Sequence, residues 1–223
     1  MNNLEVLHLD GNSLKNICGN HYCNSGLSLK RASKLKELSL KYTELVVIDE
    51  DSMENLQSLE FLDLSHNNLT RIPRHAFDNL TQIIVLKLNS NQLTNFPEIC
   101  AMQHLKDIDL SNNELTTIDH KMFCNITTLT NINLAYNKIM TIVPQAFNML
   151  PSLIALDVRC NELMMLPENL FEPITMERGQ LQPKVFSLQR LIIGDYWMSS
   201  TIKLKTIKHL SSELEITFYP ACL

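Results

Sequence analysis

The chain has 223 residues, of which 45% are hydrophobic and 19% charged, and its formal net charge is −5. This composition is typical of a folded protein and excludes a disordered chain. The charge is too small to indicate a nucleic-acid partner, and the presence of only 5 glycines disfavours the glycine-rich loops that bind nucleotides. No apolar run reaches the roughly 18 residues that a transmembrane helix needs.

A phrase of apolar residues recurs along the chain. Its copies start at Leu4, Leu35, Leu59, Ile83, Leu105, Leu129, Leu153 and Leu188, with a degenerate ninth near Ser211. The clearest copy continues from Leu59 with Leu62, Leu64 and Asn67, and it has Phe77 on its return limb. One copy cannot bury its own apolar edge, whereas stacked copies can. The period therefore predicts a solenoid with one continuous core.

The repeated phrase is that of the leucine-rich repeat, and it defines the expected fold class. We expect an α/β repeat solenoid: a curved horseshoe with a parallel β-sheet on its concave side and loops and short helices on its convex side. Residues 1–223 are expected to form a single array of eight to nine repeats without recognisable caps. The asparagine of each copy is expected to bond backbone groups that the turn leaves unpaired in the interior.

The N-terminus does not begin as a secretory signal does, because it lacks a basic start followed by an apolar run. Met1 instead occupies the place that Leu56 has before Leu59, which is the last apolar residue of a preceding repeat. We therefore expect a fragment of a longer chain, in which a signal peptide and a transmembrane helix would lie in missing segments. A cytoplasmic protein that begins at Met1 is the alternative.

Two repeats are longer than the others. The first adds CGNHYCNSGLSLKRASK after Ile17, and the seventh adds a loop over residues 172–187 that contains MERGQLQPK. Insertions in solenoids become surface loops and often lie on a binding face. A tolerated loop without a role is the alternative reading of both.

The cysteines offer two candidate disulfides. Cys18 and Cys23 flank a short excursion and could pair locally in an oxidising compartment. Cys100 and Cys124 each lie five residues before a repeat start, so they occupy equivalent positions in adjacent coils. A disulfide and two buried free thiols are both open for this second pair. Cys160 lies at the concave edge without a predicted partner and is a candidate free thiol.

The sequence contains no catalytic constellation. His21 lies between Cys18 and Cys23, but a zinc site formed by these three residues lacks a fourth ligand, so a loop histidine is the preferred reading. No nucleophile elbow or phosphate-binding loop is present. We expect no enzyme activity, no cofactor and no metal.

Three glycosylation sequons begin at Asn68, Asn79 and Asn125. The repeat phrase itself tends to produce Asn-Leu-Thr, so a single sequon indicates little. Three sequons together with six cysteines favour an extracellular location.

The strand positions that face away from the core form rows, and these rows are the predicted binding face. The candidate ligand-binding residues are Tyr42, Phe61, Asp63, His66, Lys87, Asp107, Asp109, Asn133, Tyr136, Asp157 and Arg159. Tyrosine and arginine often dominate interface energy, and the aspartates favour a neutral or basic partner. For any single residue, a solvated position without a role is the alternative.

The phrases LEVLHLDGNSL and FLDLSHNNLTRIPRHAF resemble those of the ectodomains of Toll-like receptors, over Leu4 to about Phe171. The resemblance implies a part of an innate immune receptor that contributes ligand recognition and receptor pairing but no signalling activity. Slit-like, proteoglycan-like and insect immune leucine-rich proteins share these phrases. Family binding residues are not carried over, because ligand positions differ between members.

The sequence thus predicts a non-enzymatic recognition module at the cell surface. Its expected partners are a protein or microbial ligand and a second receptor chain, with no nucleic acid and with a membrane reached only through a missing segment. An extracellular adhesion or guidance protein is one alternative, and an intracellular scaffold or regulatory subunit is the other.

Overall fold

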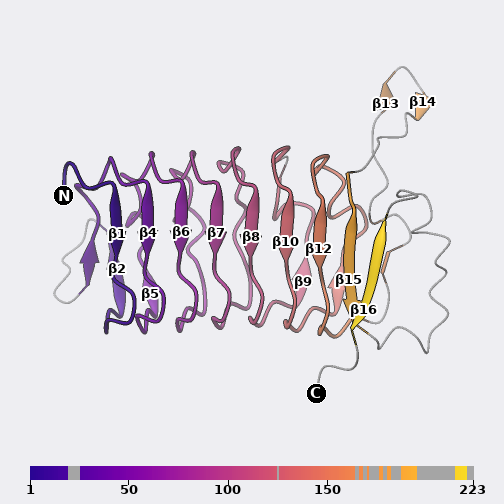
Figure 1. Cartoon of the computed structure of the whole chain (residues 1–223), viewed down its shortest axis with the longest axis horizontal. Coiled ribbons are helices and arrows are strands. Elements are labelled where there is room, and N and C mark those ends of the chain that lie inside the picture. Colours follow the sequence, from indigo (N-terminus) through magenta and orange to yellow (C-terminus); the bar gives the residue numbers. More distant parts are fainter. Residues whose placement is uncertain are drawn as a thin grey trace.

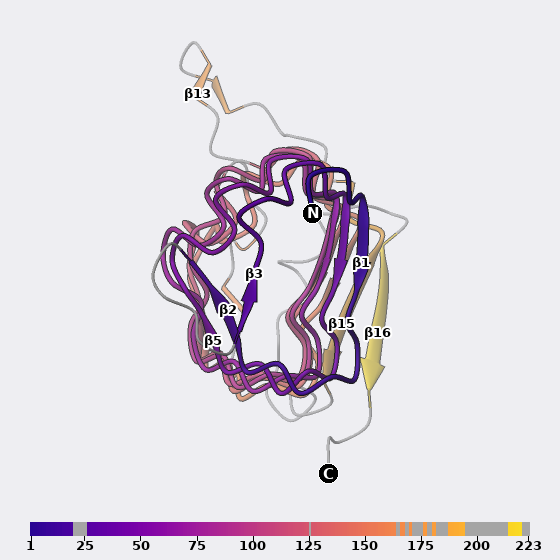
Figure 2. The same ribbon diagram turned by 90° about the vertical axis from the view of Figure 1, so that its left-hand side faces the viewer.

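The computed structural model describes residues 1–19, 26–124, 126–163, 166–167, 170, 176–177, 180–181, 187–194 and 214–219. Within these ranges the chain winds into stacked coils, and each coil contributes one short strand to a shared sheet (Figure 1). Viewed along the stack, the strands line one side of the coils and the return limbs line the other (Figure 2).

Nine parallel strands of the described residues form the shared sheet. In spatial order they are β1 (Val6–His8), β4 (Glu37–Ser39), β6 (Phe61–Asp63), β7 (Val85–Lys87), β8 (Asp107–Asp109), β10 (Asn131–Asn133), β12 (Ala155–Asp157), β15 (Arg190–Gly194) and β16 (Glu215–Tyr219). Equivalent positions of successive repeats pair, so that Leu62 lies beside Leu86 and Ile108 beside Ile132. The outer side of this sheet is called the concave face below.

The last strand is out of phase with the expected repeat start. A ninth repeat starting at Ser211 would place residue 213 beside Arg190, whereas the observed register pairs Arg190 with Glu215. The repeat therefore starts two residues later than predicted. Leu214 and Ile216 are both apolar, and a shift of two residues leaves the same side chains facing the core, so periodicity could not fix this register.

Turns and short strands form the other side of the coils. Strands β3 (Leu27–Ser28), β2 (Asn16–Cys18) and β5 (Val47–Ile48) pair in that order, and β9 (Thr117–Ile118) pairs with β11 (Thr141–Ile142). The described residues contain no helix, so the short helices expected on the convex side are not found in them. Isolated turns take their place, such as the one closed by the bond from Leu80 N–H to Phe77 O.

A continuous apolar core fills the coils. The third leucines of successive repeats, such as Leu64, Leu88 and Leu110, are 0% exposed. The return limbs contribute phenylalanines, and the rings of Phe123 and Phe147 are both fully buried with their centroids 6.0 Å apart. The apolar spacing of the sequence therefore places each coil against its two neighbours, as the solenoid requires.

Buried asparagines join neighbouring coils where the strands end. Asn113 Nδ2 donates to the carbonyl oxygens of Leu88 (3.0 Å) and Leu110 (3.1 Å), and its Oδ1 accepts from Leu93 N–H at 3.0 Å. The same pattern recurs at Asn67, Asn91, Asn137 and Asn161. In the second coil Thr43 replaces the asparagine, and its hydroxyl donates to Leu40 O at 2.8 Å. These bonds satisfy backbone groups that water cannot reach.

The insertion of the first repeat covers part of the N-terminal end of the stack. Its strand β3 pairs with β2 on the side away from β5, beyond the first coil (Figure 2). Leu27, Leu29 and Ala32 are 8%, 1% and 0% exposed, so the insertion is part of the core as well as a surface loop. Beside β1 the described residues provide no such cover, and the first-coil leucines such as Leu4 and Leu7 are only partly buried.

The described part of the seventh-repeat insertion is a short hairpin. Strands β13 (Met176–Glu177) and β14 (Gln180–Leu181) pair antiparallel, and they project away from the coils in both views (Figures 1 and 2). The remainder of the predicted loop lies mostly outside the described residues. In the part of the chain that the structure describes, no helix could cross a membrane.

Candidate binding face

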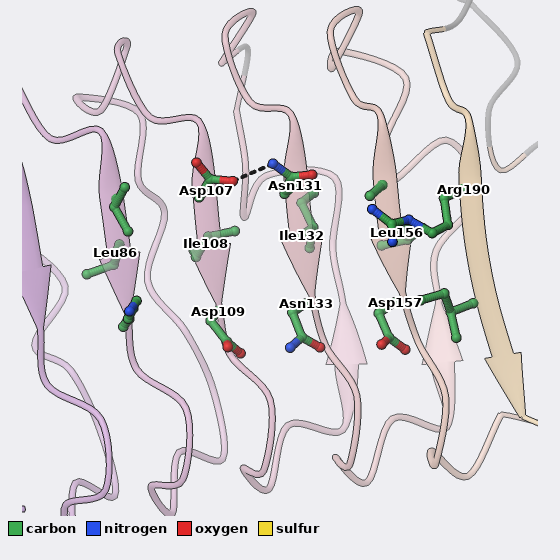
Figure 3. Close-up of a pocket in the computed structure, with 14 residues that line it drawn as sticks. Leu86, Asp107, Ile108, Asp109, Asn131, Ile132, Asn133, Leu156, Asp157 and Arg190 are labelled. Atoms are coloured by element: carbon green, nitrogen blue, oxygen red, sulfur yellow. Dashed lines mark hydrogen bonds between the residues drawn. The ribbon is translucent and has the colours of Figure 1, made fainter. Parts of the chain in front are cut away.

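Alternation along each short strand creates the concave face. The middle residue of a strand, such as Leu86 or Ile108, points into the core, while the residues on either side of it point outward. Parallel pairing in register then aligns the outward residues into rows across the sheet. Figure 3 shows one row with Asp107, Asn131 and Arg190, and a second row with Asp109, Asn133 and Asp157.

An open hollow of about 320 Å³ crosses strands β7, β8, β10, β12 and β15. Its polar lining consists of Lys87, Asp107, Asp109, Asn131, Asn133, Asp157 and Arg190. Val85, Ala155 and Ile192 add apolar surface. Such a mixture of apolar floor and a few convergent polar groups is characteristic of recognition sites.

Hydrogen bonds from the backbone hold the second row of the hollow, which consists of Asp109, Asn133 and Asp157 (Figure 3). Asp109 Oδ1 accepts from both the N–H (3.0 Å) and the hydroxyl (2.6 Å) of Ser111. Asn133 and Asp157 make the same turn, each accepting at 3.1 Å from the N–H two residues further on. These side chains are held before any partner arrives, which limits the entropy that binding would cost.

Asp157 is the most buried carboxylate of the hollow, at 9% exposure. Burial raises the pKa of its carboxyl above the usual value, while the hydrogen bond from Arg159 N–H and the charge of Arg159 oppose this rise. Arg159 Nε lies 3.2 Å from Asp157 Oδ2, and its guanidinium also lies 5.7 Å from the ring centroid of Tyr136. Asp157 therefore helps to position Arg159 at the edge of the face.

The hollow carries one more carboxylate than cations. Lys87 is directed toward β6, because its Nζ lies 4.0 Å from Asp63 Oδ2 and 5.4 Å from the ring centroid of Phe61. Asp107 accepts a hydrogen bond from Asn131 (Figure 3), and neither Asp107 nor Asp109 forms an ion pair with a described residue. A neutral or cationic partner group is therefore favoured over an anionic one.

A second feature borders the concave face where the strands end. The residue before each ladder position has a left-handed backbone, with φ between 54° and 73°. This left-handed row consists of Gly11, Tyr42, His66, Ser90, Asn112, Tyr136 and Cys160. Glycine and asparagine adopt this conformation readily, whereas a residue such as tyrosine has a cost of roughly 1–2 kcal/mol.

The structure divides the eleven predicted ligand-binding residues between these features. Lys87, Asp107, Asp109, Asn133 and Asp157 line the hollow. Tyr42, His66 and Tyr136 belong to the left-handed row, and Phe61, Asp63 and Arg159 lie beside the hollow and contact its residues or the row. Asp63 is only 6% exposed and bonds Ser65 N–H at 2.9 Å, so much of its role is structural.

Two polar residues of the hollow were not among the predicted candidates. Asn131 and Arg190 occupy the same strand position as Asp107, at the first residue of β10 and β15. Each lies two residues after its repeat start, as Asp107 does, so the periodicity of the sequence already places all three in one row. The sequence alone could not indicate which part of the row lies over the hollow.

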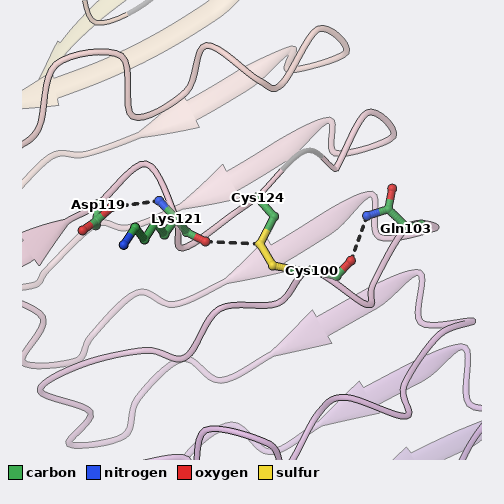
Figure 4. The surroundings of a disulfide bond; sticks show 5 residues. All are labelled: Cys100, Gln103, Asp119, Lys121 and Cys124. Carbon is green, nitrogen blue, oxygen red and sulfur yellow. Dashed lines mark hydrogen bonds between the residues drawn. A yellow bond between two sulfur atoms is a disulfide. The ribbon is translucent and has the colours of Figure 1, made fainter.

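The disulfide between Cys100 and Cys124 joins equivalent positions of adjacent coils, with Cα atoms 5.2 Å apart (Figure 4). Of the two alternatives for this pair, free thiols are thus wrong. Cys18 and Cys160 are also disulfide-bonded. Cys160 is therefore not a free thiol, and Cys18 is not available as a zinc ligand. Cys23 lies outside the described residues, so its pairing with Cys18 stays a prediction.

The predicted modification sites have different surroundings. Asn68 is exposed, Asn79 is half-buried, and Asn125 lies outside the described residues. Glycosylation of all three stays a prediction. Among the residues that the structure describes, no group of three or more histidine, cysteine, aspartate or glutamate side chains is arranged to hold a metal ion.

Stacked coils that share a parallel sheet and display fixed side chains on its outer face define a protein-interaction module. A family model described as leucine rich repeat matches the chain over residues 2–69, 33–93, 62–102, 85–139 and 103–163. The chain belongs to the leucine-rich-repeat family.

Two solved structures are similar to the chain. Internalin C2 from Listeria monocytogenes is 26% identical with a TM-score of 0.59, and the match covers 73% of this chain and 64% of that protein. A leucine-rich-repeat protein from Leptospira interrogans is 26% identical with a TM-score of 0.68, and the match covers 96% and 54%. The chain therefore spans less than two thirds of either protein. No curated protein matches it.

Proposed function

We propose that this protein-interaction module belongs to the ectodomain of an innate immune receptor of the Toll-like kind, where it binds a protein or microbial ligand. The hollow on the concave face carries the proposal. Backbone hydrogen bonds hold its side chains Asp109, Asn133 and Asp157 in place. Two of its carboxylates, those of Asp107 and Asp109, are not neutralised by ion pairs with described residues. Recognition would be non-enzymatic, with a neutral or basic surface of the partner seated over β8 to β12.

Removal of one charge from the hollow tests this use of the face. Asp109→Asn keeps an oxygen that can accept from Ser111 N–H, as Asn133 does in the next coil, so the fold should persist. We expect phage-displayed random dodecapeptides selected on the wild-type chain to bind Asp109→Asn at least about fivefold more weakly, because an interface charge is lost. Bio-layer interferometry of purified clones measures the change.

The matched control is Asp119→Asn. It removes the same charge from the same kind of turn, because Asp119 Oδ1 accepts from Lys121 N–H, but Asp119 lies on the return limb and does not line the hollow. Binding should change little in this variant. Equal losses in the two variants, or clones that bind both as tightly as wild type, would contradict the proposed use of the hollow.

The extracellular location is supported by the disulfides, because such bonds persist mainly in oxidising compartments. We expect the chain from a eukaryotic secretory host to carry sugar at Asn68 and to contain an oxidised Cys100–Cys124 pair. Intact mass with and without glycosidase and reductant measures both. A well-folded product with bare asparagines and free thiols would instead favour the intracellular scaffold.

A bacterial leucine-rich-repeat protein is the second candidate. The observation that favours it is the source of the two similar structures, since both come from bacteria. An intact disulfide on a chain whose sequons stay unmodified in the secretory host would favour this candidate. The adhesion or guidance alternative shares the expected sugar and disulfide, so identification of the ligand would separate it from the receptor.

A further inference from the structure

We infer that Tyr42 and Tyr136 are two anchor points for a protein partner along the edge of the concave face. The inference rests on the proposed function, because it names contacts for the same partner outside the hollow. It starts from the left-handed row, where the backbone is uniform but the side chains are not.

The fold gives no reason for tyrosine at these two positions. Every residue of the left-handed row has φ between 54° and 73°, a conformation that disfavours most residues with a Cβ. Tyr42 and Tyr136 are 54% and 46% exposed, so their rings are not needed to fill the core. A disfavoured backbone combined with an exposed apolar side chain indicates that the side chain serves a contact outside the chain.

Neighbouring side chains hold both rings in place without covering them. The Tyr42 ring stacks on His66 with centroids 4.2 Å apart, and Lys41 Nζ lies 5.1 Å from its centre. The Tyr136 ring lies 5.7 Å from the guanidinium of Arg159, which Asp157 in turn positions. Aromatic rings that are oriented in advance lose little freedom on binding, which is characteristic of interface hot spots.

The distance between the anchors indicates the kind of partner. Tyr42 follows β4 and Tyr136 follows β10, which are four steps apart in the sheet. At about 4.8 Å for each step, the anchors are separated by roughly 19 Å along the array. Between them in the row lie His66, which stacks on Tyr42, and Ser90 and Asn112, which have short side chains. A small molecule cannot contact both anchors, so the ligand we infer is a protein segment with two apolar contact points.

Glycine substitutions test the backbone part of this inference without a partner. Tyr136→Gly removes the ring and relaxes the backbone, so its melting temperature should lie within about 2 °C of wild type or above it. Ser90→Gly is the matched control, because it makes the same backbone change where no ring is present. A Tyr136→Gly melting temperature well below that of Ser90→Gly would show that the ring stabilises the fold, and would overturn the inference.

Binding is tested with the same phage-displayed dodecapeptides, which when extended reach up to about 40 Å and can contact both anchors. Most clones selected on the wild-type chain should bind Tyr42→Gly and Tyr136→Gly at least about tenfold more weakly each. They should bind Ser90→Gly and Asn112→Gly as wild type. Equal losses in the control variants would show a backbone effect and overturn the inference.

The two proposals fail differently in this experiment. Clones that depend on Asp109 but bind the tyrosine variants as wild type would leave the hollow as the binding site and overturn the anchors. Clones that depend on neither Asp109 nor the tyrosines, or a library that yields no binding clone, would contradict both.

Discussion

Replacement of Leu110 by aspartate is expected to unfold the centre of the array. Leu110 is 0% exposed and follows β8 in the middle of the stack, where its N–H donates to Asn133 O at 2.9 Å. The variant loses a buried leucine, which typically costs about 2–5 kcal/mol. It also places a carboxylate in an apolar interior, which adds several kcal/mol more or forces the group to take up a proton.

Because each coil contacts only its neighbours, damage at the centre should divide the array. Urea denaturation followed by circular dichroism should show a strongly lowered midpoint or two separate transitions in place of one. Asn112→Asp is the control, since it adds the same charge two residues away at an exposed position. A Leu110→Asp variant that melts cooperatively near the wild-type midpoint would show that the assigned core register is wrong.

Replacement of Asn113 by alanine is expected to have the second largest effect. The side chain makes four bonds to the backbone: it donates to the carbonyl oxygens of Leu88, Leu110 and Ser111 and accepts from Leu93 N–H. Without this side chain Leu93 N–H loses its partner, at roughly 1–3 kcal/mol. The carbonyls of Leu88, Leu110 and Ser111 each keep another donor and lose one bond, at roughly 0.5–1.5 kcal/mol each. The free energy of unfolding, obtained from urea titration, should therefore fall by about 3–6 kcal/mol.

The control for Asn113→Ala makes the same chemical change on the open face. Asn89 is half-exposed on the concave side, and Asn89→Ala should change stability by no more than about 0.5 kcal/mol. Similar stabilities for the two variants would mean that water replaces the lost bonds, and that the asparagine ladder contributes less than its geometry suggests.

The regular part of the fold could be predicted because the sequence repeats it. The spacing of Leu59, Leu62 and Leu64 determines which residues face the core, and the same spacing recurs in each coil. The phase becomes uncertain only where the pattern degenerates, as at β16, where Leu214 and Ile216 allow two registers that bury the same side of the strand. The role of the first insertion was also hidden, because nothing in its composition shows that Leu27 and Leu29 turn back into the core.

The sequence could predict which residues share a row of the concave face, but not which of them are exposed to a partner. Periodicity assigns Asp63 and Asp109 to the same row, yet the structure buries the first and leaves the second in the hollow. The difference depends on which neighbouring side chains cover them, and that is decided by packing between coils. The left-handed backbone under Tyr42 and Tyr136 was also not visible in the sequence, because tyrosine is a poor indicator of that conformation.

The bond between Cys100 and Cys124 has a mechanical consequence. It closes a loop whose ends are 24 residues apart, which is one full coil of the array. Under tension applied at its two ends, a stack of coils lengthens as coils detach, and each coil of this size releases roughly 80 Å of contour length. The coil closed by the disulfide cannot release its contour length, even when the other coils have detached. An oxidised chain is therefore shorter at full stretch than a reduced one, and pulling cannot extend that coil until the sulfur–sulfur bond breaks.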